Sequence, residues 1–514
     1  MNLKPSEKLT ENQIQKGLNL LIKDGVMAEM MATLTGGAFL VSLALKFGAS
    51  NFQIGLMASL PTLASLFQLI SIYLVYKYAN RKAITVYTGL ISRTPLFLIG
   101  LLPLFLPPDI ALVMLISFLF FHYFFGSISG SAWGSWIKDL VPEKGLGRYF
   151  SNRTRIIQIL NVFLSYTVAH VLDYIRHNFP QEETLTYAIM FMLGGASGLI
   201  GLLILIYVPE PVMVPQKQDY IKLFKKPLNN LNYRNLLVFN AFWAFAVNLA
   251  APFFTVYLLK MLKMNLSDVV TFSIISQLTN ILFIRIWGKY SDKYSNKTII
   301  QVCAPLYICC LLAWTFTTLP EKHNFTFPLL ILIYLFSGVA MAGINLALNN
   351  IGIKMAPKGD AIVYLTTKNI TNGLFAATAP LIGGFFADYF SKRELAWTVV
   401  WKDPEGITSF YTLDLQNWDF FFAIAVVVGL FALYRLSFVK EEGEVEERVV
   451  MTEMRAELLR EMKAYSSIAG LRSMVYLPIS FIMLIKEKVV RKKLKVDKNK
   501  EDTTESNEKL LKSK

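Results

Sequence analysis

Charged residues and cysteines are scarce in this chain of 514 residues. Asp, Glu, Lys and Arg together make up 17% of the sequence, whereas hydrophobic residues make up 54%. A water-soluble protein of this size needs more polar surface than these numbers provide. The three cysteines, Cys303, Cys309 and Cys310, all lie in one apolar segment, where a thiol behaves as a small hydrophobic group. We therefore predict no disulfide and no metal site.

Several motifs of enzymes and pumps are also missing. The sequence has no GxxxxGK[ST] phosphate-binding loop, which argues against ATP-driven pumping, and no HExxH zinc motif. It has only four histidines and its acidic residues are scattered, so we expect neither catalytic residues nor a cofactor. The first twenty residues are polar and amphipathic, so we expect no cleaved leader.

Long apolar runs are what the sequence does contain. A bilayer core about 30 Å thick takes roughly 20 helical residues, and twelve runs of about this length fill most of the first 440 positions. They lie near residues 26–47, 53–76, 84–106, 110–136, 156–176, 185–208, 236–259, 268–287, 298–319, 327–351, 369–389 and 418–438. The predicted fold class is an all-α membrane protein with twelve transmembrane helices.

Basic residues are distributed unevenly between the loops. With the N-terminus in the cytoplasm, the inner loops hold nineteen Lys and Arg and the outer loops six. This asymmetry predicts a multi-pass protein of the cell (inner) membrane with both termini cytoplasmic. Because most of the net charge of +15 then lies in membrane-domain loops, we expect the lipid bilayer and no nucleic acid as a partner.

Two short basic loops reveal an internal repeat. Residues 77–82 read KYANRK and residues 293–298 read KYSNKT, 216 positions apart. Segments 132–154 and 347–369, aligned at an offset of 215, share an alanine, a proline and a tyrosine. Because each copy contains six spans, an even number, both copies enter the membrane from the same side. The sequence therefore predicts two parallel six-helix repeats.

The repeat divides the chain into four expected parts. They are an N-terminal six-helix bundle (1–208), a cytoplasmic linker (209–235), a C-terminal six-helix bundle (236–439) and a cytoplasmic tail with amphipathic and disordered segments (440–514).

The second basic loop resembles a signature of the major facilitator superfamily (MFS). GKYSDKYSNK supplies Gly288, Asp292, Lys293 and Lys297, with Ser295 where that family has Gly. The first copy keeps its basic residues but has Tyr in place of the Asp. The resemblance covers roughly residues 20–440. The segments GSWIKDLVPE and KDGVMAE resemble those of a bacterial branch of the family whose substrate is unassigned. The resemblance implies the MFS fold and a permease that works by alternating access as a symporter or antiporter.

The resemblance also implies a gate at the second loop. Asp292 is expected to face the start of the fifth span and to pair with Lys354 of the tenth, closing the inner side. The alternative is that Lys293 and Lys297 only orient the loop by the positive-inside rule.

Ionisable residues inside the spans are candidates for ion coupling, because each costs at least about 2.5 kcal/mol to insert. Glu29 is the first candidate, since burial favours the protonated form of a carboxylate and Thr33 follows on the same helical face. The others are Asp24, Arg93 and His122. A structural pair between Arg93 and Glu29 or another acid is the open alternative, and Asp24 is also interpretable as a boundary residue.

Polar residues of both halves are candidates for a substrate cavity. Amides and indoles suit a neutral or zwitterionic solute, although buried amides also link helices without binding anything. The candidates besides Thr33 are Ser129, Trp133, Trp136, Asn240, Asn248, Gln277, Asn280, Asn345 and Asn349.

The expected function is secondary active transport of a small solute, with a proton as the expected coupling ion. Sodium symport and uniport remain open. The rival hypotheses are a membrane-embedded enzyme and a non-transporting scaffold or receptor.

Overall fold

A computed structural model of the protein describes residues 3–456 with short gaps. The gaps are residues 4, 7–8, 143–145, 214–224, 319–324, 358–360, 392, 404–405, 417, 442, 446–447 and 454–455. The chain divides into two compact units, Met1–Glu444 and Val445–Lys514, and the elements below belong to the first. Most of the tail predicted to be amphipathic and disordered lies outside the described residues and stays a prediction.

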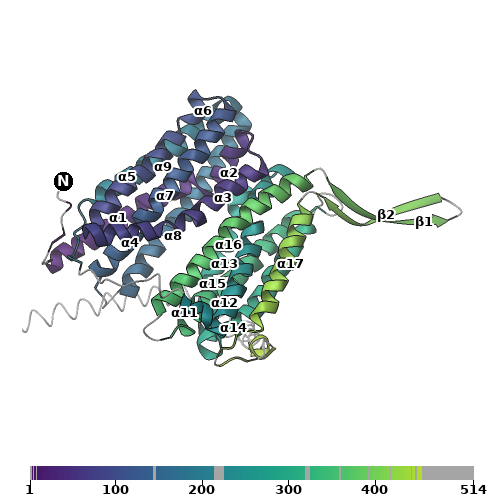
Figure 1. Cartoon of the computed structure of the whole chain (residues 1–514). Coiled ribbons are helices and arrows are strands. Elements are labelled where there is room, and N and C mark those ends of the chain that lie inside the picture. Colours follow the sequence, from purple (N-terminus) through teal and green to yellow (C-terminus); the bar gives the residue numbers. More distant parts are fainter. Residues whose placement is uncertain are drawn as a thin grey trace, which may run out of the picture. The chain divides into compact units, whose positions relative to one another are not determined.

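Helices build the N-terminal half of the first unit (Figure 1). In chain order they are α1 (Glu11–Thr35), α2 (Gly37–Lys46), α3 (Asn51–Ser65), α4 (Gln68–Tyr78), α5 (Arg81–Ile99), α6 (Leu102–Phe105), α7 (Pro108–Leu140), α8 (Leu146–Asn178), the 3-10 turn η1 (Pro180–Glu182) and α9 (Glu183–Leu205).

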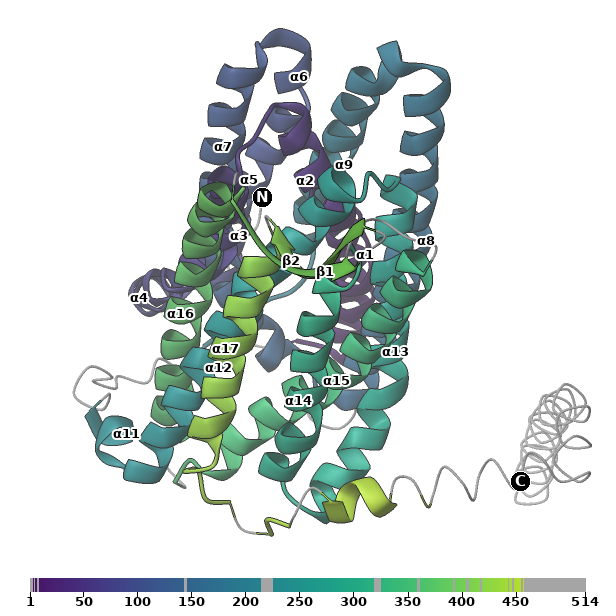
Figure 2. The same cartoon turned by 90° about the vertical axis from the view of Figure 1, so that its right-hand side faces the viewer.

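The C-terminal half follows the same plan (Figure 2). Its elements are α11 (Lys225–Asn229), α12 (Leu231–Val256), the π-helical turn η2 (Tyr257–Met261), α13 (Leu266–Lys293), α14 (Asn296–Thr315), α15 (Thr326–Lys354), α16 (Ala361–Phe390) and α17 (Asp419–Leu436).

Eleven helical segments in the described part of the chain are long and apolar enough to cross a membrane. The predicted third span is represented by α5, which has 19 residues and contains Arg81, Lys82 and Arg93. Nineteen helical residues extend about 28 Å, close to the thickness of a bilayer core. The predicted helical membrane fold is confirmed, and the order of its spans follows the apolar runs.

The first span begins earlier than predicted. Its apolar run suggested a start near residue 26, but α1 starts at Glu11. Thr10 and Gln13 form a capping box there: the Thr10 hydroxyl accepts from the Gln13 N–H at 3.3 Å, and the Gln13 side chain accepts from the Thr10 N–H at 2.9 Å. Capping satisfies N–H groups that the first helical turn leaves free, so a polar segment becomes helical.

A β-hairpin separates α16 from α17, a segment for which the sequence analysis gave no secondary structure. Strands β1 (Glu394–Asp403) and β2 (Gly406–Gln416) pair antiparallel, with Glu394 opposite Gln416. The hairpin extends beyond the ends of the helices (Figure 1). β-Branched and aromatic residues, with a Pro-Glu-Gly connection, carry the signal for it in the sequence.

Two helix pairs make the most extensive contacts between the halves, and we call them seams. In the tight seam α3 packs closely on α16, and in the loose seam α8 packs less extensively on α13. Both seams include the helix ends that lie opposite the basic loops, where α3 and α13 begin. Gly55 of α3 belongs to the tight seam, because a side chain there would overlap the Pro380 carbonyl oxygen of α16.

Candidate functional site

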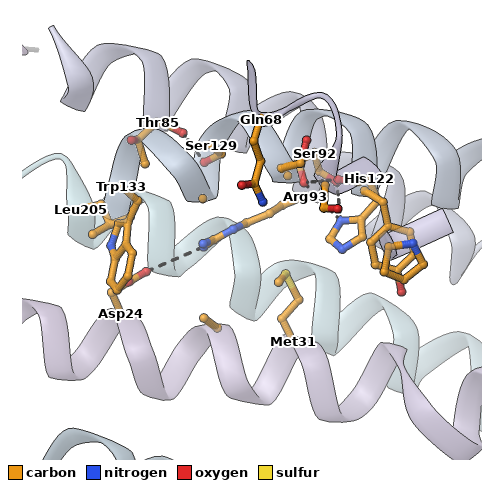
Figure 3. Close-up of a pocket in the computed structure, with 18 of the residues that line it drawn as sticks. Asp24, Met31, Gln68, Thr85, Ser92, Arg93, His122, Ser129, Trp133 and Leu205 are labelled. Carbon is orange, nitrogen blue, oxygen red and sulfur yellow. Dashed lines mark hydrogen bonds and ion pairs between the residues drawn. The ribbon is translucent and has the colours of Figure 1, made fainter. Parts of the chain in front are cut away.

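A cavity of about 460 Å³ lies within the N-terminal half (Figure 3). Helices α1, α3, α4, α5, α7, α8 and α9 contribute to its wall. Its polar lining consists of Asp24, Ser65, Gln68, Thr85, Ser92, Arg93, His122, Tyr123, Ser127, Ser129, Trp133 and Arg153. The structure therefore brings five of the predicted site residues, from three helices, to one cavity.

Asp24 and Arg93 face each other across this cavity. Asp24 Oδ1 lies 3.9 Å from Arg93 Nη1, and Arg93 Nη1 also donates to the Gly198 carbonyl at 2.6 Å. Figure 3 shows the Arg93 side chain extended between Gln68 and Met31 toward Asp24. A Cβ atom at Gly201 would lie 2.9 Å from Arg93 Nη1 and 3.1 Å from Asp24 Oδ1. A glycine in α9 thus leaves room for the pair.

His122 links α7 to α5. Its Nδ1 lies 2.9 Å from the Ser92 carbonyl oxygen, and the Ser92 hydroxyl donates to the His122 carbonyl at 2.8 Å. Because a carbonyl oxygen only accepts, Nδ1 carries the proton in this arrangement. His122 therefore positions the α5 segment that carries Arg93.

Three buried polar atoms in the cavity wall have no hydrogen-bond partner within the described part of the protein. They are Asp24 Oδ1, Thr85 Oγ1 and Trp133 Nε1. Asp24 as a whole is only 3% exposed. Buried polar groups in proteins are almost always hydrogen-bonded to protein, water or ligand. These three atoms can therefore bond to water or to a polar ligand in the cavity.

Arg153 is a cavity residue that the sequence analysis missed. Its guanidinium carbon lies 5.3 Å from the centre of the Trp133 ring, and its Nε donates to the Leu21 carbonyl at 3.4 Å. A Cβ atom at Gly25 would lie 2.8 Å from Arg153 Nη2, so glycine lets this arginine lie across α1. The apolar-run pattern placed Arg153 in an inner loop, whereas α8 already begins at Leu146.

Ser129 and Trp136, four and three positions from Trp133, differ in their surroundings. Ser129 lines the cavity and donates to the Thr85 carbonyl at 2.9 Å. Trp136 is fully buried in a hydrophobic cluster, and its Nε1 donates to the Pro209 carbonyl at 2.9 Å. The structure therefore places Trp136 in the packed core of the N-terminal half rather than in the cavity.

Glu29 lines a second cavity of about 270 Å³, at the loose seam. The Asn161 amide of α8 donates to Glu29 Oε1 at 2.7 Å and to Thr33 Oγ1 at 3.0 Å. From α13, Gln277 lines this cavity and donates to Gln158 of α8. Glu29 and Thr33 thus lie together as predicted from helical spacing, with an amide rather than Arg93 as their partner.

The other amides of the C-terminal half do not line either cavity. Asn240 and Asn248 donate to carbonyls of their own helix at 3.0 and 2.8 Å. Asn280 donates to the Gly338 carbonyl of α15 at 3.5 Å. Asn345 and Asn349 are exposed.

The predicted gate residues at the second basic loop have separate surroundings. A Cβ atom added at Gly288 would lie 3.9 Å from the Leu346 side chain. Asp292 and Lys293 are exposed, and the Lys293 ammonium lies 5.1 Å from the centre of the Tyr294 ring. Within the described residues, Asp292 makes no hydrogen bond or ion pair in this conformation.

Lys297 and Lys354 instead bind glutamates that follow α17. Glu441 Oε2 accepts from the Lys297 N–H at 2.7 Å, and its Oε1 lies 3.2 Å from Lys354 Nζ. The Lys297 ammonium pairs with Glu444 at 2.6 Å. The sequence analysis missed both glutamates because they lie in the segment assigned to the tail.

The first basic loop has the same arrangement. Glu210, which follows α9, accepts from the N–H groups of Arg81 and Lys82 at 2.8 and 3.1 Å. Lys82 and Lys297 are 215 positions apart, so the capped helix starts correspond in the repeat. In each half, a glutamate after the last span caps the helix that follows the basic loop. These caps stay within one half.

Comparisons with known proteins agree with the fold. The family described as Major Facilitator Superfamily matches residues 25–367, more than half of the chain. The crystal structure of the nucleoside transporter NupG is similar with a TM-score of 0.56 and 13% identity, over 84% of this chain and all (100%) of that one. A bacterial homologue of the iron transporter ferroportin, in an inward-facing state, gives a TM-score of 0.59 and 10% identity, over 84% and 100%.

A third similar structure is the inward-open xylose transporter XylE from E. coli. Its TM-score is 0.54 and its identity 15%, over 85% of this chain and 98% of that one. A search of curated proteins gave no match. The extent of the family match, together with the repeated six-helix plan, shows that the chain belongs to the major facilitator superfamily.

Proposed function

We propose that this protein is a secondary transporter that moves a small polar solute across the cell membrane and binds it in the cavity around Asp24 and Arg93. The observation that carries the proposal is the set of buried polar atoms in the cavity wall that have no hydrogen-bond partner within the described residues. A charged pair within membrane-spanning helices is costly to insert, so its place beside a cavity favours a role in binding. The volume of about 460 Å³ suits a small molecule.

Alternating access is the mechanism we propose. Both seams include the helix ends opposite the basic loops, while the glutamate contacts at the basic loops stay within their own half. With the basic loops cytoplasmic, this is a state closed on the outside. Rocking of the two halves about the bound solute would then expose the cavity to the other side. Asp292 is proposed to find its partner in that second state.

Proteoliposomes test the transport proposal directly. Candidate solutes are first chosen as compounds that raise the melting temperature of the purified protein. Each is then added in radiolabelled form to vesicles preloaded with the same unlabelled compound. We expect counterflow that exceeds the rate in protein-free vesicles. A folded, ligand-binding protein that gives no counterflow and no gradient-driven uptake contradicts transport.

Glu29 is proposed as the proton-coupling group, because it lies at the loose seam with an amide as its hydrogen-bond partner. A protonated and an ionised carboxylate make different hydrogen bonds with Asn161, so the charge of Glu29 can bias the seam. We expect Glu29→Gln to lower uptake driven by an imposed pH gradient at least tenfold and to leave counterflow nearly unchanged. Glu182→Gln, at an exposed site in η1, is the control. Unchanged pH-driven uptake in Glu29→Gln rules out this assignment.

A further inference from the structure

Hydrogen-bond donors outnumber acceptors among the charged groups of the N-terminal cavity. The two guanidinium groups of Arg93 and Arg153 each carry five N–H donors, and Trp133 adds an indole N–H. Asp24 is the single carboxylate in the wall. A solute that fits this lining must bring acceptors, and more than one.

The charges of the cavity are also unbalanced. Arg93 has Asp24 as its counter-charge at 3.9 Å. Arg153 contacts a backbone carbonyl and the face of Trp133, and no carboxylate of the described residues lies within ion-pair distance of it. Inside a membrane protein, where polar groups are poorly solvated, an unmatched cation strongly favours an anionic partner.

We propose that the cavity binds an organic anion: a solute with a carboxylate or phosphoryl group for Arg153 and Arg93, and a hydroxyl that donates to Asp24 Oδ1. Its less polar face lies against Trp133. This inference rests on the proposed function, since it names the solute class for the same cavity. It replaces the neutral or zwitterionic solute expected from the amides, because those amides lie elsewhere.

Matched ligand pairs test the proposal on the purified full chain. Small hydroxycarboxylates are each compared with their neutral amides, and phosphomonoesters with their dephosphorylated forms, by calorimetry. We expect at least one anion to bind tenfold or more tightly than its neutral partner, and the two series to show whether carboxylate or phosphoryl is preferred. If every neutral compound binds as well as its anion, the proposal is wrong.

Arg153 variants supply the second readout. Arg153→Gln should lower the affinity for the preferred anion at least tenfold and leave the affinity for its neutral partner compound unchanged. Arg153→Lys should keep part of the preference for the anion. Equal anion affinity in Arg153→Gln overturns the proposal, provided the melting temperature shows that the variant is folded. Anion binding without transport would contradict the proposed function and leave the anion site intact.

A separate observation concerns two aspartates at the seams. Asp173 of α8 accepts from the N–H groups of Leu266 and Ser267 at 3.1 and 2.6 Å, and so caps α13 of the other half. Asp388 of α16 accepts from the N–H groups of Asn51 and Phe52 at 3.1 and 2.9 Å, and so caps α3. The aspartates are 215 positions apart, as are Leu266 and Asn51, and Ser267 and Phe52.

The two caps are therefore copies of one contact, and both cross between the halves. A carboxylate at a helix N-terminus accepts from N–H groups that have no intrahelical partner and interacts favourably with the helix dipole. The glutamate caps of the basic loops use the same chemistry but join helices of a single half. Separation of the halves breaks the aspartate caps and leaves the glutamate caps in place.

We infer that Asp173 and Asp388 form a two-fold latch that holds the helix ends opposite the basic loops together. Spin labels on the exposed Asn178 and Met261, in a protein with the exposed Cys309 replaced by serine, report the distance across the loose seam. We expect Asp173→Ala and Asp388→Ala each to raise the population of the longer distance, and the double variant to raise it at least tenfold over the parent protein.

Three further variants separate the latch from a general loss of packing. Asp173→Asn and Asp388→Asn keep one acceptor oxygen and should give an intermediate shift. Glu182→Gln should give none. A double alanine variant that is folded and shows the parent distance distribution overturns the latch.

Discussion

Replacing Gly55 with alanine is expected to lower solute uptake about a hundredfold while the protein stays folded. A Cβ atom at this position would overlap the Pro380 carbonyl oxygen and lie 3.0 Å from the carbonyl carbon. Both are backbone atoms of α16 and cannot turn away as a flexible side chain does. Overpacking typically costs about 1–3 kcal/mol, and a clash with backbone belongs at the upper end. The overlap disappears when the tight seam opens, so the variant should populate the open seam.

Uptake into proteoliposomes and the Asn178 to Met261 distance measure the effect. Gly134→Ala is the matched control, because a Cβ atom at that helical glycine meets no heavy atom within 4 Å. Alanine favours a helix over glycine by about 1 kcal/mol, so the control should be as stable as the parent or more so. Normal uptake by Gly55→Ala would mean that α3 and α16 need not approach this closely during transport.

Asparagine at position 24 is expected to reduce both stability and uptake strongly. The Asp24 side chain is 4% exposed and that of Arg93 15%. Removal of one partner from a buried ion pair typically costs about 3–5 kcal/mol, because the remaining charge is left uncompensated. For Asp24→Asn we therefore expect a lower melting temperature and uptake reduced at least a hundredfold.

The double variant Asp24→Asn with Arg93→Gln distinguishes a structural pair from a binding site. It removes both charges and should recover most of the melting temperature. Because the solute would lose an acceptor and a cation together, uptake should stay low. Recovery of uptake together with stability would show that the pair only holds α1 and α5 in place.

Much of the fold could be predicted because a bilayer imposes a length on each apolar run. The repeat could be detected for a similar reason, because membrane topology requires basic residues in both of its inner loops. Ends of elements were harder: α1 extends back to Glu11 through polar residues because of a local cap at Thr10. The hairpin lies outside the apolar runs, so a search based on hydrophobic length passed over it.

Residues of the candidate site could be predicted mainly where the free-energy cost of placing an ionisable group in a membrane span made them stand out. Asp24, Arg93 and His122 were found as ionisable groups within spans, and Ser129 and Trp133 as polar neighbours on one helical face. Their partners could not be found in this way, because a hydrogen bond to the Gly198 carbonyl leaves no trace in sequence spacing.

The amides show what helical periodicity cannot predict. Helical spacing places residues on a face, but it does not say whether an amide reaches a cavity or its own backbone, as Asn240 and Asn248 do. For Asp173 and Asp388 a signal did exist. They are 215 positions apart, at the offset of the repeat.

The unequal seams have a pharmacological consequence. A compound that fills the cavity of about 270 Å³ beside Glu29 contacts both halves at the loose seam, and would act there as a wedge that arrests the conformational cycle. The proposed solute site is the other cavity, around Asp24, so wedge and solute would not compete for the same groups. Raising the solute concentration would not relieve such an inhibitor, whereas a mimic of the solute would be displaced.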